Sequence, residues 1–303
     1  MMSKRWIGNS VLLLGAMIWG AAFVAQSVGM DYLGPFTFQA ARSLLGALVL
    51  LPVIAGMDKR GNTHRPVTPA AKKRQLGYGL LVGVILFAAC SLQQCGLLYT
   101  APGKSGFLTS LYIILVPLVG LLFGRRVKPW IWGSVALAIV GLYLLCGSTE
   151  FSLGPGEWLT LGCALAFCFH ILVIDHISGT VDAVRLSAMQ FFVCGMLSLV
   201  CMVIWEQPSW DNLLACWLPI AYAGILSSGL GYTLQIIGQA YTEPTVASLL
   251  MSLESVFSVV FGWIILRSAL TPAELVGCCL VFGGVIISQL PGKAPVPNPQ
   301  KSH

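Results

Sequence analysis

A glutamate interrupts an otherwise apolar stretch in the last quarter of the chain. Glu254 lies in the segment MSLESVFSVV, residues 251 to 260. A charge near the centre of a bilayer costs about 2.5 to 3.5 kcal/mol, and such residues usually face a bundle interior or a water-filled path. Glu254 could therefore exchange a proton or hold a cationic group of a substrate. The structural alternative is a carboxyl that is permanently neutral or paired with an arginine.

Arg42 is a second ionisable residue inside an apolar stretch. It lies about six residues, or roughly 9 Å, from one end of its predicted helix. The depths expected for Arg42 and Glu254 differ by roughly 9 Å, so a bridging substrate or water fits at least as well as a direct pair. Arg42 could also bind a substrate carboxylate, and the structural alternative is snorkelling to the membrane surface.

The elements that carry these residues are predicted from the hydropathy of the chain. Hydrophobic residues make up 57% of it and charged residues 9%, with a mean hydropathy of +0.85, whereas soluble domains have roughly 25% charged residues. Its apolar runs are each about as long as the roughly 20 residues that cross a bilayer as a helix. We therefore predict an all-α integral membrane protein with ten transmembrane helices, at residues 7–28, 36–55, 76–98, 104–124, 129–147, 157–175, 185–205, 216–238, 246–266 and 272–290.

The basic residues orient these helices. Cytoplasmic loops of membrane proteins collect Lys and Arg, and this bias accounts for the net charge of +6 without a nucleic-acid partner. If the N-terminus is cytoplasmic, the opposite face receives only Lys104 and Arg267. The cytoplasmic side then receives fourteen basic residues: Lys4, Arg5, Lys59, Arg60, Arg65, Lys72, Lys73, Arg74, Arg125, Arg126, Lys128, Arg185, Lys293 and Lys301. Both termini are therefore expected in the cytoplasm, with the Pro-rich tail 291–303 disordered.

The two halves of the chain resemble each other. The segment SLQQCGLLYTAPGKSGFLTSLYI (91 to 113) aligns without a gap with TLQIIGQAYTEPTVASLLMSLES (233 to 255), and a Tyr-Thr-x-Pro loop keeps its distance from Gln-x-x-Gly. Residues 7–147 and 157–290 each hold five predicted helices. Because five is odd, the second half must cross the membrane in the opposite sense. Inverted repeats are typical of secondary transporters, which bind substrate near the midplane and expose it alternately to each side.

Four segments carry a resemblance to a known family. GAMIWGAAFV, FQAARSLLGAL, YTAPGKSGFLTSLYIILVPLVGLLFGRRVKPWIWG and YTEPTVASLLMSLESVFSVVFGWIILRSALTPAELVG look like the two EamA domains of the drug/metabolite transporter superfamily. The resemblance covers about residues 10 to 290. It implies a ten-helix bundle with both termini cytoplasmic and a central cavity lined mainly by the first four helices of each half. It also implies the transport of small metabolites, often by export.

The repeat relates Glu254 to Tyr112, and each lies about eight residues, roughly 12 Å, into its helix from opposite faces. Both are thus expected near the middle of the cavity, and Pro117 invites a kink beside them. The other candidate substrate-binding residues are polar or aromatic groups on the cavity-forming helices: Trp19, Gln93, Thr109, Tyr232, Gln235 and Ser252. Small hydroxylic residues such as Thr109 and Ser252 equally suit close helix packing.

These residues predict a secondary transporter in the cell membrane that moves a small polar or amphipathic metabolite by alternating access. An amino-acid-like solute is favoured, and proton coupling through Glu254 is a hypothesis. The alternative is an uncoupled facilitator or exchanger of organic cations or drugs. We expect no metal or other cofactor, and either a monomer or a homodimer. The ten cysteines form no CxxC pair and no zinc-like cluster with histidines.

An intramembrane hydrolase is the remote alternative. GKSG at residues 103 to 106 matches the serine motif of intramembrane proteases, and His170 lies in a later predicted helix. Ser105 and His170 are expected to differ in depth by roughly 18 Å, whereas a nucleophile needs its base at about 3 Å. The predicted depths therefore argue against catalysis.

Overall fold

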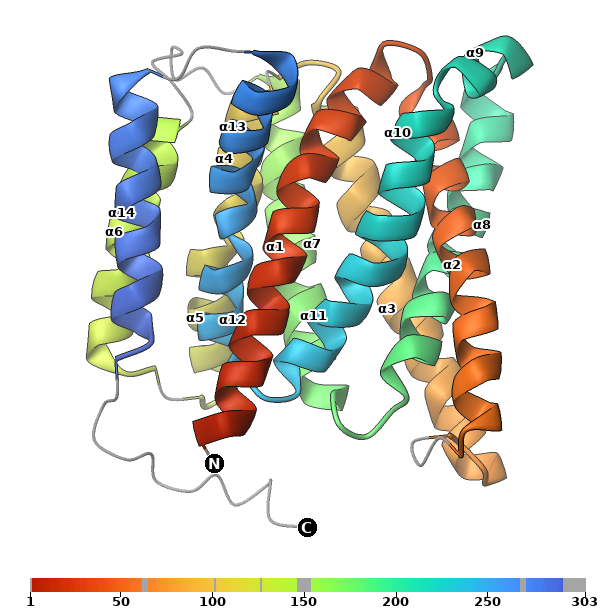
Figure 1. Cartoon of the computed structure of the whole chain (residues 1–303), viewed down its shortest axis with the longest axis horizontal. Helices are drawn as coiled ribbons and strands as arrows, with labels where there is room; N and C mark the ends of the chain where they lie inside the picture. Colours follow the sequence, from red (N-terminus) through yellow and green to blue (C-terminus); the bar gives the residue numbers. More distant parts are fainter. Residues whose placement is uncertain are drawn as a thin grey trace.

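The computed structural model describes residues 2–61, 65–100, 102–125, 127–145, 154–267 and 271–290. Within these residues the regular structure is helical (Figure 1). The elements are α1 (Met2–Met30), α2 (Pro35–Lys59), α3 (Pro69–Gly96), α4 (Pro102–Ser110), α5 (Tyr112–Leu122), α6 (Pro129–Leu145), α7 (Pro155–Ile177), α8 (Ala183–Trp205), α9 (Trp210–Ala215), α10 (Trp217–Ala221), the π-helix η1 (Tyr222–Gly231), α11 (Tyr232–Gln239), α12 (Pro244–Met251), α13 (Leu253–Leu266) and α14 (Pro272–Ser288).

Eight helical stretches of the described chain are long and apolar enough to cross a membrane. The predicted runs 129–147 and 272–290 correspond to the shorter apolar helices α6 and α14, which have 17 residues each. The protein is thus a multi-pass membrane protein. The predicted tail 291–303 lies outside the described residues.

Prolines and capping side chains begin many of the helices. Proline occupies the first turn of α2, α3, α7, α12 and α14, where its missing N–H costs no helical hydrogen bond. Thr68 caps α3, Asp182 caps α8, and Thr271 forms a capping box with Glu274 at the start of α14. These local signals explain why the structure starts α3 at Pro69 rather than at residue 76.

Three of the membrane helices are irregular, and the sequence predicted only a kink at Pro117. The predicted helix 104–124 is interrupted at Leu111, between α4 and α5, only by a one-residue turn with right-handed helical backbone angles (φ −61°, ψ −9°), and α5 runs through Pro117. The predicted helix 246–266 has a similar one-residue turn at Ser252, between α12 and α13, where the amide still donates to the Ser248 carbonyl oxygen at 2.9 Å. The predicted helix 216–238 contains the ten-residue π-helix η1. Such π segments are rare and frequently lie at functional sites.

The long helices pack in pairs that join the two halves of the chain. α2 packs along α8, α3 along α7, α1 along α13, and α6 along α14. In Figure 1 the α6–α14 pair forms one edge of the bundle, and α2 and α8 lie at the opposite edge. The start of α1 and the end of α14 lie at the same end of the bundle (Figure 1), where the Asn9 amide donates to Gln289 Oε1 at 2.6 Å.

Two glycines make matching contacts in the two halves. A Cβ added at Gly8 would lie 3.0 Å from the carbonyl oxygen of Gly238 and against Tyr241 and Thr242. A Cβ at Gly156 would lie 3.0 Å from the carbonyl oxygen of Gly96 and against the side chains of Tyr99 and Thr100, which are the repeat equivalents of those residues. Only glycine permits this close approach of two helix backbones.

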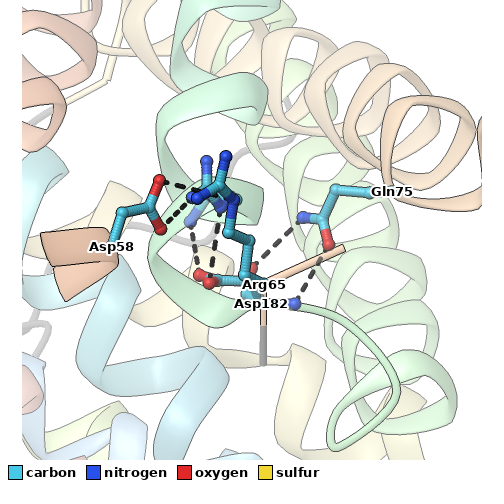
Figure 2. A network of polar contacts seen from close by, with 5 residues as sticks. Asp58, Arg65, Gln75 and Asp182 are labelled. Carbon is cyan, nitrogen blue, oxygen red and sulfur yellow. Dashed lines mark hydrogen bonds and ion pairs between the residues drawn. The ribbon is translucent and has the colours of Figure 1, made fainter. Parts of the chain in front are cut away.

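Polar contacts tie the α2–α8 pair at both ends. At one end Arg185 of α8 pairs with Asp58 of α2, and Arg65 Nε lies 3.7 Å from Asp58 Oδ2. Figure 2 shows this network together with Gln75 of α3, whose amide bonds the backbone nitrogen and oxygen of Asp182 at 3.0 and 3.2 Å.

At the other end of the pair, the Glu206 carboxylate receives three hydrogen bonds from the start of α2. Its Oε1 accepts from the Phe36 amide at 2.8 Å, and its Oε2 accepts from the Thr37 amide at 2.8 Å and hydroxyl at 2.6 Å. The free N–H groups and the positive end of the helix dipole favour an anion there. Neither end of the α2–α8 pair is therefore free to separate without breaking charged contacts.

Candidate substrate cavity

A cavity opens among α1, α2, α3, α5, α7, η1, α11, α12 and α13. Seven of the nine residues predicted from the sequence line it: Trp19, Arg42, Gln93, Tyr112, Tyr232, Gln235 and Glu254. Residues that are up to 235 positions apart in the chain thus meet around one space. The described lining also includes six residues that the sequence did not single out: Phe23, Gln26, Phe167, Ile171, Ser227 and Met251.

Glu254 lies where the two interrupted helices meet. Tyr112, the first residue of α5, donates its hydroxyl to Glu254 Oε1 at 3.3 Å. Next to this bond, the hydroxyls of Ser110 and Ser255 lie 2.9 Å apart. The repeat-related residues Tyr112 and Glu254 are therefore in direct contact, and Glu254 is 9% exposed.

Arg42 projects into the same cavity from α2 and is 5% exposed. Its Nε donates to Gln39 Oε1 at 2.7 Å, and its guanidinium carbon lies 5.9 Å from the centre of the Phe38 ring. Among the described residues Arg42 forms no ion pair with a carboxylate, Glu254 included. The cavity thus contains a guanidinium and a carboxyl group that can each receive an oppositely charged group of a ligand.

Aromatic rings form much of the wall between these two groups. The ring centroids of Trp19 and Tyr232 are 4.9 Å apart, and the two rings meet edge-on. Two further rings meet Tyr232 edge-on, with centroid distances of 5.0 Å for Phe191 and 5.9 Å for His170. Such pairs contribute about 0.5–1.5 kcal/mol beyond their burial. The Tyr232 ring is therefore held firmly at the cavity wall.

Three amides add neutral hydrogen-bonding groups. Gln93 donates to Thr109 Oγ1 at 3.3 Å, and Gln235 donates to Gln239 at 2.9 Å. The carbonyl oxygens of Gln26 and Gln235 and the indole nitrogen of Trp19 are buried and have no partner within the described chain. Buried polar atoms of this kind cost about 1–3 kcal/mol when unpaired, so the wall retains hydrogen-bonding capacity for a ligand or water.

Two of the predicted residues lie outside the described lining. Thr109 contacts Gln93 and, at 3.9 Å, Cys163 Sγ. Ser252 donates to the carbonyl oxygen of Leu249 at 2.8 Å, within its own helix turn. Their side chains serve local packing in this structure, and their role in binding stays a prediction.

The residues that the sequence analysis missed differ in how visible they were. Phe23 and Gln26 follow Trp19 at four and seven residues along α1, a spacing that places them on one helix face. That signal could have found them. Ser227 belongs to η1, and the side-chain directions of a π-helix do not follow the α-helical period, so the sequence offered no such signal for it.

No serine–histidine pair forms at the residues considered for catalysis. His170 Nε2 lies 3.1 Å from Gln190 Oε1, and Ser105 Oγ has no hydrogen-bond partner within the described chain. A search of the described residues finds no group of three His, Cys, Asp or Glu side chains that could hold a metal ion. The features that stand out here are those of a binding cavity.

Comparison with known proteins also indicates a transporter. The profile of the EamA-like transporter family matches residues 6–147 and again 154–290. An uncharacterized transporter of Archaeoglobus fulgidus is 31% identical over 95% of this chain and 87% of its own length. The WAT1-related chloroplastic protein At3g02690 of Arabidopsis thaliana is 24% identical over 93% of this chain and 69% of its own length. A crystal structure with 20% identity covers 95% of this chain and 97% of its own, with a TM-score of 0.77, and so shares the fold.

Proposed function

Because the chain belongs to the EamA-like transporter family, its role is transport, and we propose that it carries a small zwitterionic, amino-acid-like solute. One observation carries this proposal: Arg42 and Glu254 line the same cavity and form no ion pair with each other in the described structure. Buried charges that lack an oppositely charged partner are costly. A solute with a carboxylate and an ammonium group would compensate both.

The aromatic wall supports an apolar, aromatic side chain on this solute. Five rings face the cavity: Trp19, Phe23, Tyr112, Phe167 and Tyr232. Aromatic pairs prefer the edge-on and offset geometries that these rings offer. The carbonyl oxygens of Gln26 and Gln235, which have no partner within the described chain, can accept further hydrogen bonds from this solute.

The transport mechanism in this proposal is alternating access between two inverted five-helix repeats, residues 7–147 and 157–290. The matched contacts of Gly8 and Gly156 support it, as does the direct contact between the repeat-related residues Tyr112 and Glu254. The distribution of Lys and Arg supports a cell-membrane orientation with both termini cytoplasmic. Export, which the family resemblance favours, is the proposed direction, and the protein acts as a monomer or a homodimer.

Glu254 also supports two coupling schemes. As a carboxyl that binds either a proton or the solute's ammonium group, it would couple export to the proton gradient. The second candidate is uncoupled transport or exchange of organic cations or drugs. The Glu254 carboxyl group beside aromatic rings favours this second candidate, because the faces of aromatic rings attract cations.

Flux measurements with three related probes test the proposal. Purified protein is reconstituted into liposomes, and uptake of labelled L-phenylalanine, phenethylamine and 3-phenylpropionate is compared with uptake into protein-free liposomes. The probes share one ring and carry both charges, only the ammonium group or only the carboxylate. The proposal predicts that the zwitterion is taken up with the lowest KM. Flux of phenethylamine alone would favour the organic-cation alternative, and no flux above the protein-free level would contradict both.

A further inference from the structure

Gln39 connects the cavity arginine to the neighbouring helix. It lies in α2, is fully buried, and does not line the cavity. We propose that Gln39 is a positioning residue that holds the Arg42 guanidinium at the cavity wall and thereby sets the affinity for carboxylate-bearing solutes. This inference rests on the proposed function in that Arg42 is taken as the group that receives the carboxylate.

The hydrogen bonds of Gln39 fix which way its amide points. Its carbonyl oxygen accepts from Arg42 Nε at 2.7 Å, whereas its Nε2 lies 3.0 Å from Cys194 Sγ and 3.4 Å from Ser43 Oγ. A guanidinium group only donates, so the oxygen must face Arg42. The reversed amide would lose this bond. Gln39 therefore has one orientation, with its oxygen on Arg42 and its nitrogen on α8.

The contacts with Gln39 and with the Cys90 thiol of α3 leave further donors of Arg42 available. The guanidinium group has five N–H donors in a rigid planar fork. Gln39 takes the Nε–H, and the Phe38 ring lies 5.9 Å from the guanidinium carbon. A neutral acceptor holds the group without compensating its charge, which a glutamate in the same place would do. Glutamine is thus the side chain that positions Arg42 and keeps it attractive to an anion.

Through Cys194, Gln39 is bonded to α8, and α8 is joined to α2 at both ends. Cys194 lies near the middle of α8, and no described residue of α8 lines the cavity. Asp58 and Arg185 join the two helices at the end shown in Figure 2, and Glu206 joins them at the other end. Arg42 is consequently anchored to a part of the bundle that both ends hold together.

Three variants separate positioning from packing. Gln39→Met removes the acceptor at nearly constant volume, and Gln39→Glu keeps the acceptor but neutralises the guanidinium. Gln94→Met is the matched control, because Gln94 is also fully buried and its amide has no partner in the described chain. Uptake of the three phenyl probes is measured for each variant. Both Gln39 variants should raise KM for the two carboxylate-bearing probes by about tenfold, the loss expected for one charged hydrogen bond. KM for phenethylamine and the maximal rate should stay within twofold, and Gln94→Met should match wild type throughout.

The second readout needs no substrate. The Arg42 Nε–H signal is identified in ¹⁵N NMR spectra of the detergent-solubilised protein by its loss in Arg42→Lys, and its exchange with solvent is measured. Exchange should stay slow in Gln39→Glu and become at least about tenfold faster in Gln39→Met. Unchanged exchange in Gln39→Met would overturn the positioning role. Faster exchange with unchanged KM for carboxylates would overturn its link to affinity. If wild type carries none of the probes, the proposed substrate class fails, while the exchange rates still decide whether Gln39 positions Arg42.

Discussion

At the scale of single residues, the sequence predicted the members of the cavity better than their contacts. Glu254 and Arg42 were visible because ionisable residues rarely occur inside apolar runs. Depth along a helix, however, does not give the rotation of the helix about its axis. The direct bond between Tyr112 and Glu254 could therefore not be derived. Gln39 precedes Arg42 by three residues, a spacing that places both on one helix face, and this signal was overlooked.

Arg42→Gln tests the proposed anion-binding role of the arginine. Truncating one member of a buried charge pair costs about 2–5 kcal/mol, so KM for L-phenylalanine and 3-phenylpropionate should rise at least roughly 30-fold. Phenethylamine uptake should change little. Arg74→Gln is the control, since Arg74 is exposed and bonds only the Thr180 carbonyl in the described structure. Equal losses for all three probes would instead assign Arg42 to folding or to the transport cycle in general.

At the scale of the elements, the hydrophobic runs located the helices, and the prolines and caps explain their starts. The interruptions at Leu111 and Ser252 and the π-helix η1 were not predicted. Local sequence specifies whether a segment is apolar enough to be helical. Contacts across the bundle, such as that between Ser110 and Ser255, which lie far apart in the chain, cannot be derived from the local sequence.

Gln75→Ala tests how much the polar network near the start of α3 contributes to stability. The change removes both bonds from Gln75 to the backbone of Asp182, which is 2% exposed. The Asp182 carbonyl oxygen still accepts from the Leu186 amide at 2.8 Å, so the cost is that of the two lost hydrogen bonds, about 0.5–1.5 kcal/mol each. The thermal unfolding temperature of the detergent-solubilised protein should fall clearly. Arg74→Ala, which removes one exposed bond to Thr180, should shift it by much less. Equal unfolding temperatures for the two variants would refute the structural role of Gln75.

Two engineered disulfides distinguish the moving contacts from the fixed ones. Ser110→Cys with Ser255→Cys joins the interrupted helices where their hydroxyls lie 2.9 Å apart. Leu44→Cys with Gly195→Cys joins α2 to α8, where a Cβ at Gly195 would lie 2.8 Å from Leu44 Cγ. The first cross-link should stop L-phenylalanine flux until it is reduced, and the second should leave flux intact.

Disulfide formation in both variants is verified by mass spectrometry of the linked peptides, with oxidised wild type as the control for the native cysteines. Flux is recorded before and after addition of a reductant. A functional Ser110–Ser255 cross-link, or a block by the α2–α8 cross-link, would reverse the assignment of moving and fixed parts.

At the scale of the whole molecule, the internal repeat predicted that the two halves would meet around a shared site. The helix pairs that join the halves and the matched contacts of Gly8 and Gly156 agree with this arrangement. The substrate, the coupling ion and the direction of transport are set by a few side chains and by the driving force, so the fold and family alone do not supply them. The substrate class and the coupling ion proposed above rest on the charges of the cavity, and the flux measurements test them.

The most direct test of the account is simultaneous recording of solute flux and lumenal pH in proteoliposomes with wild type and Glu254→Gln. Glu243→Gln is the control, because Glu243 is exposed at the start of α12. The account predicts that wild type moves protons in exchange for L-phenylalanine. Glu254→Gln should lose the pH change and retain solute exchange only with a raised KM, and Glu243→Gln should behave as wild type. Unchanged flux and pH coupling in a folded Glu254→Gln protein would contradict the central claim that solute binding and proton coupling depend on the carboxyl in this cavity.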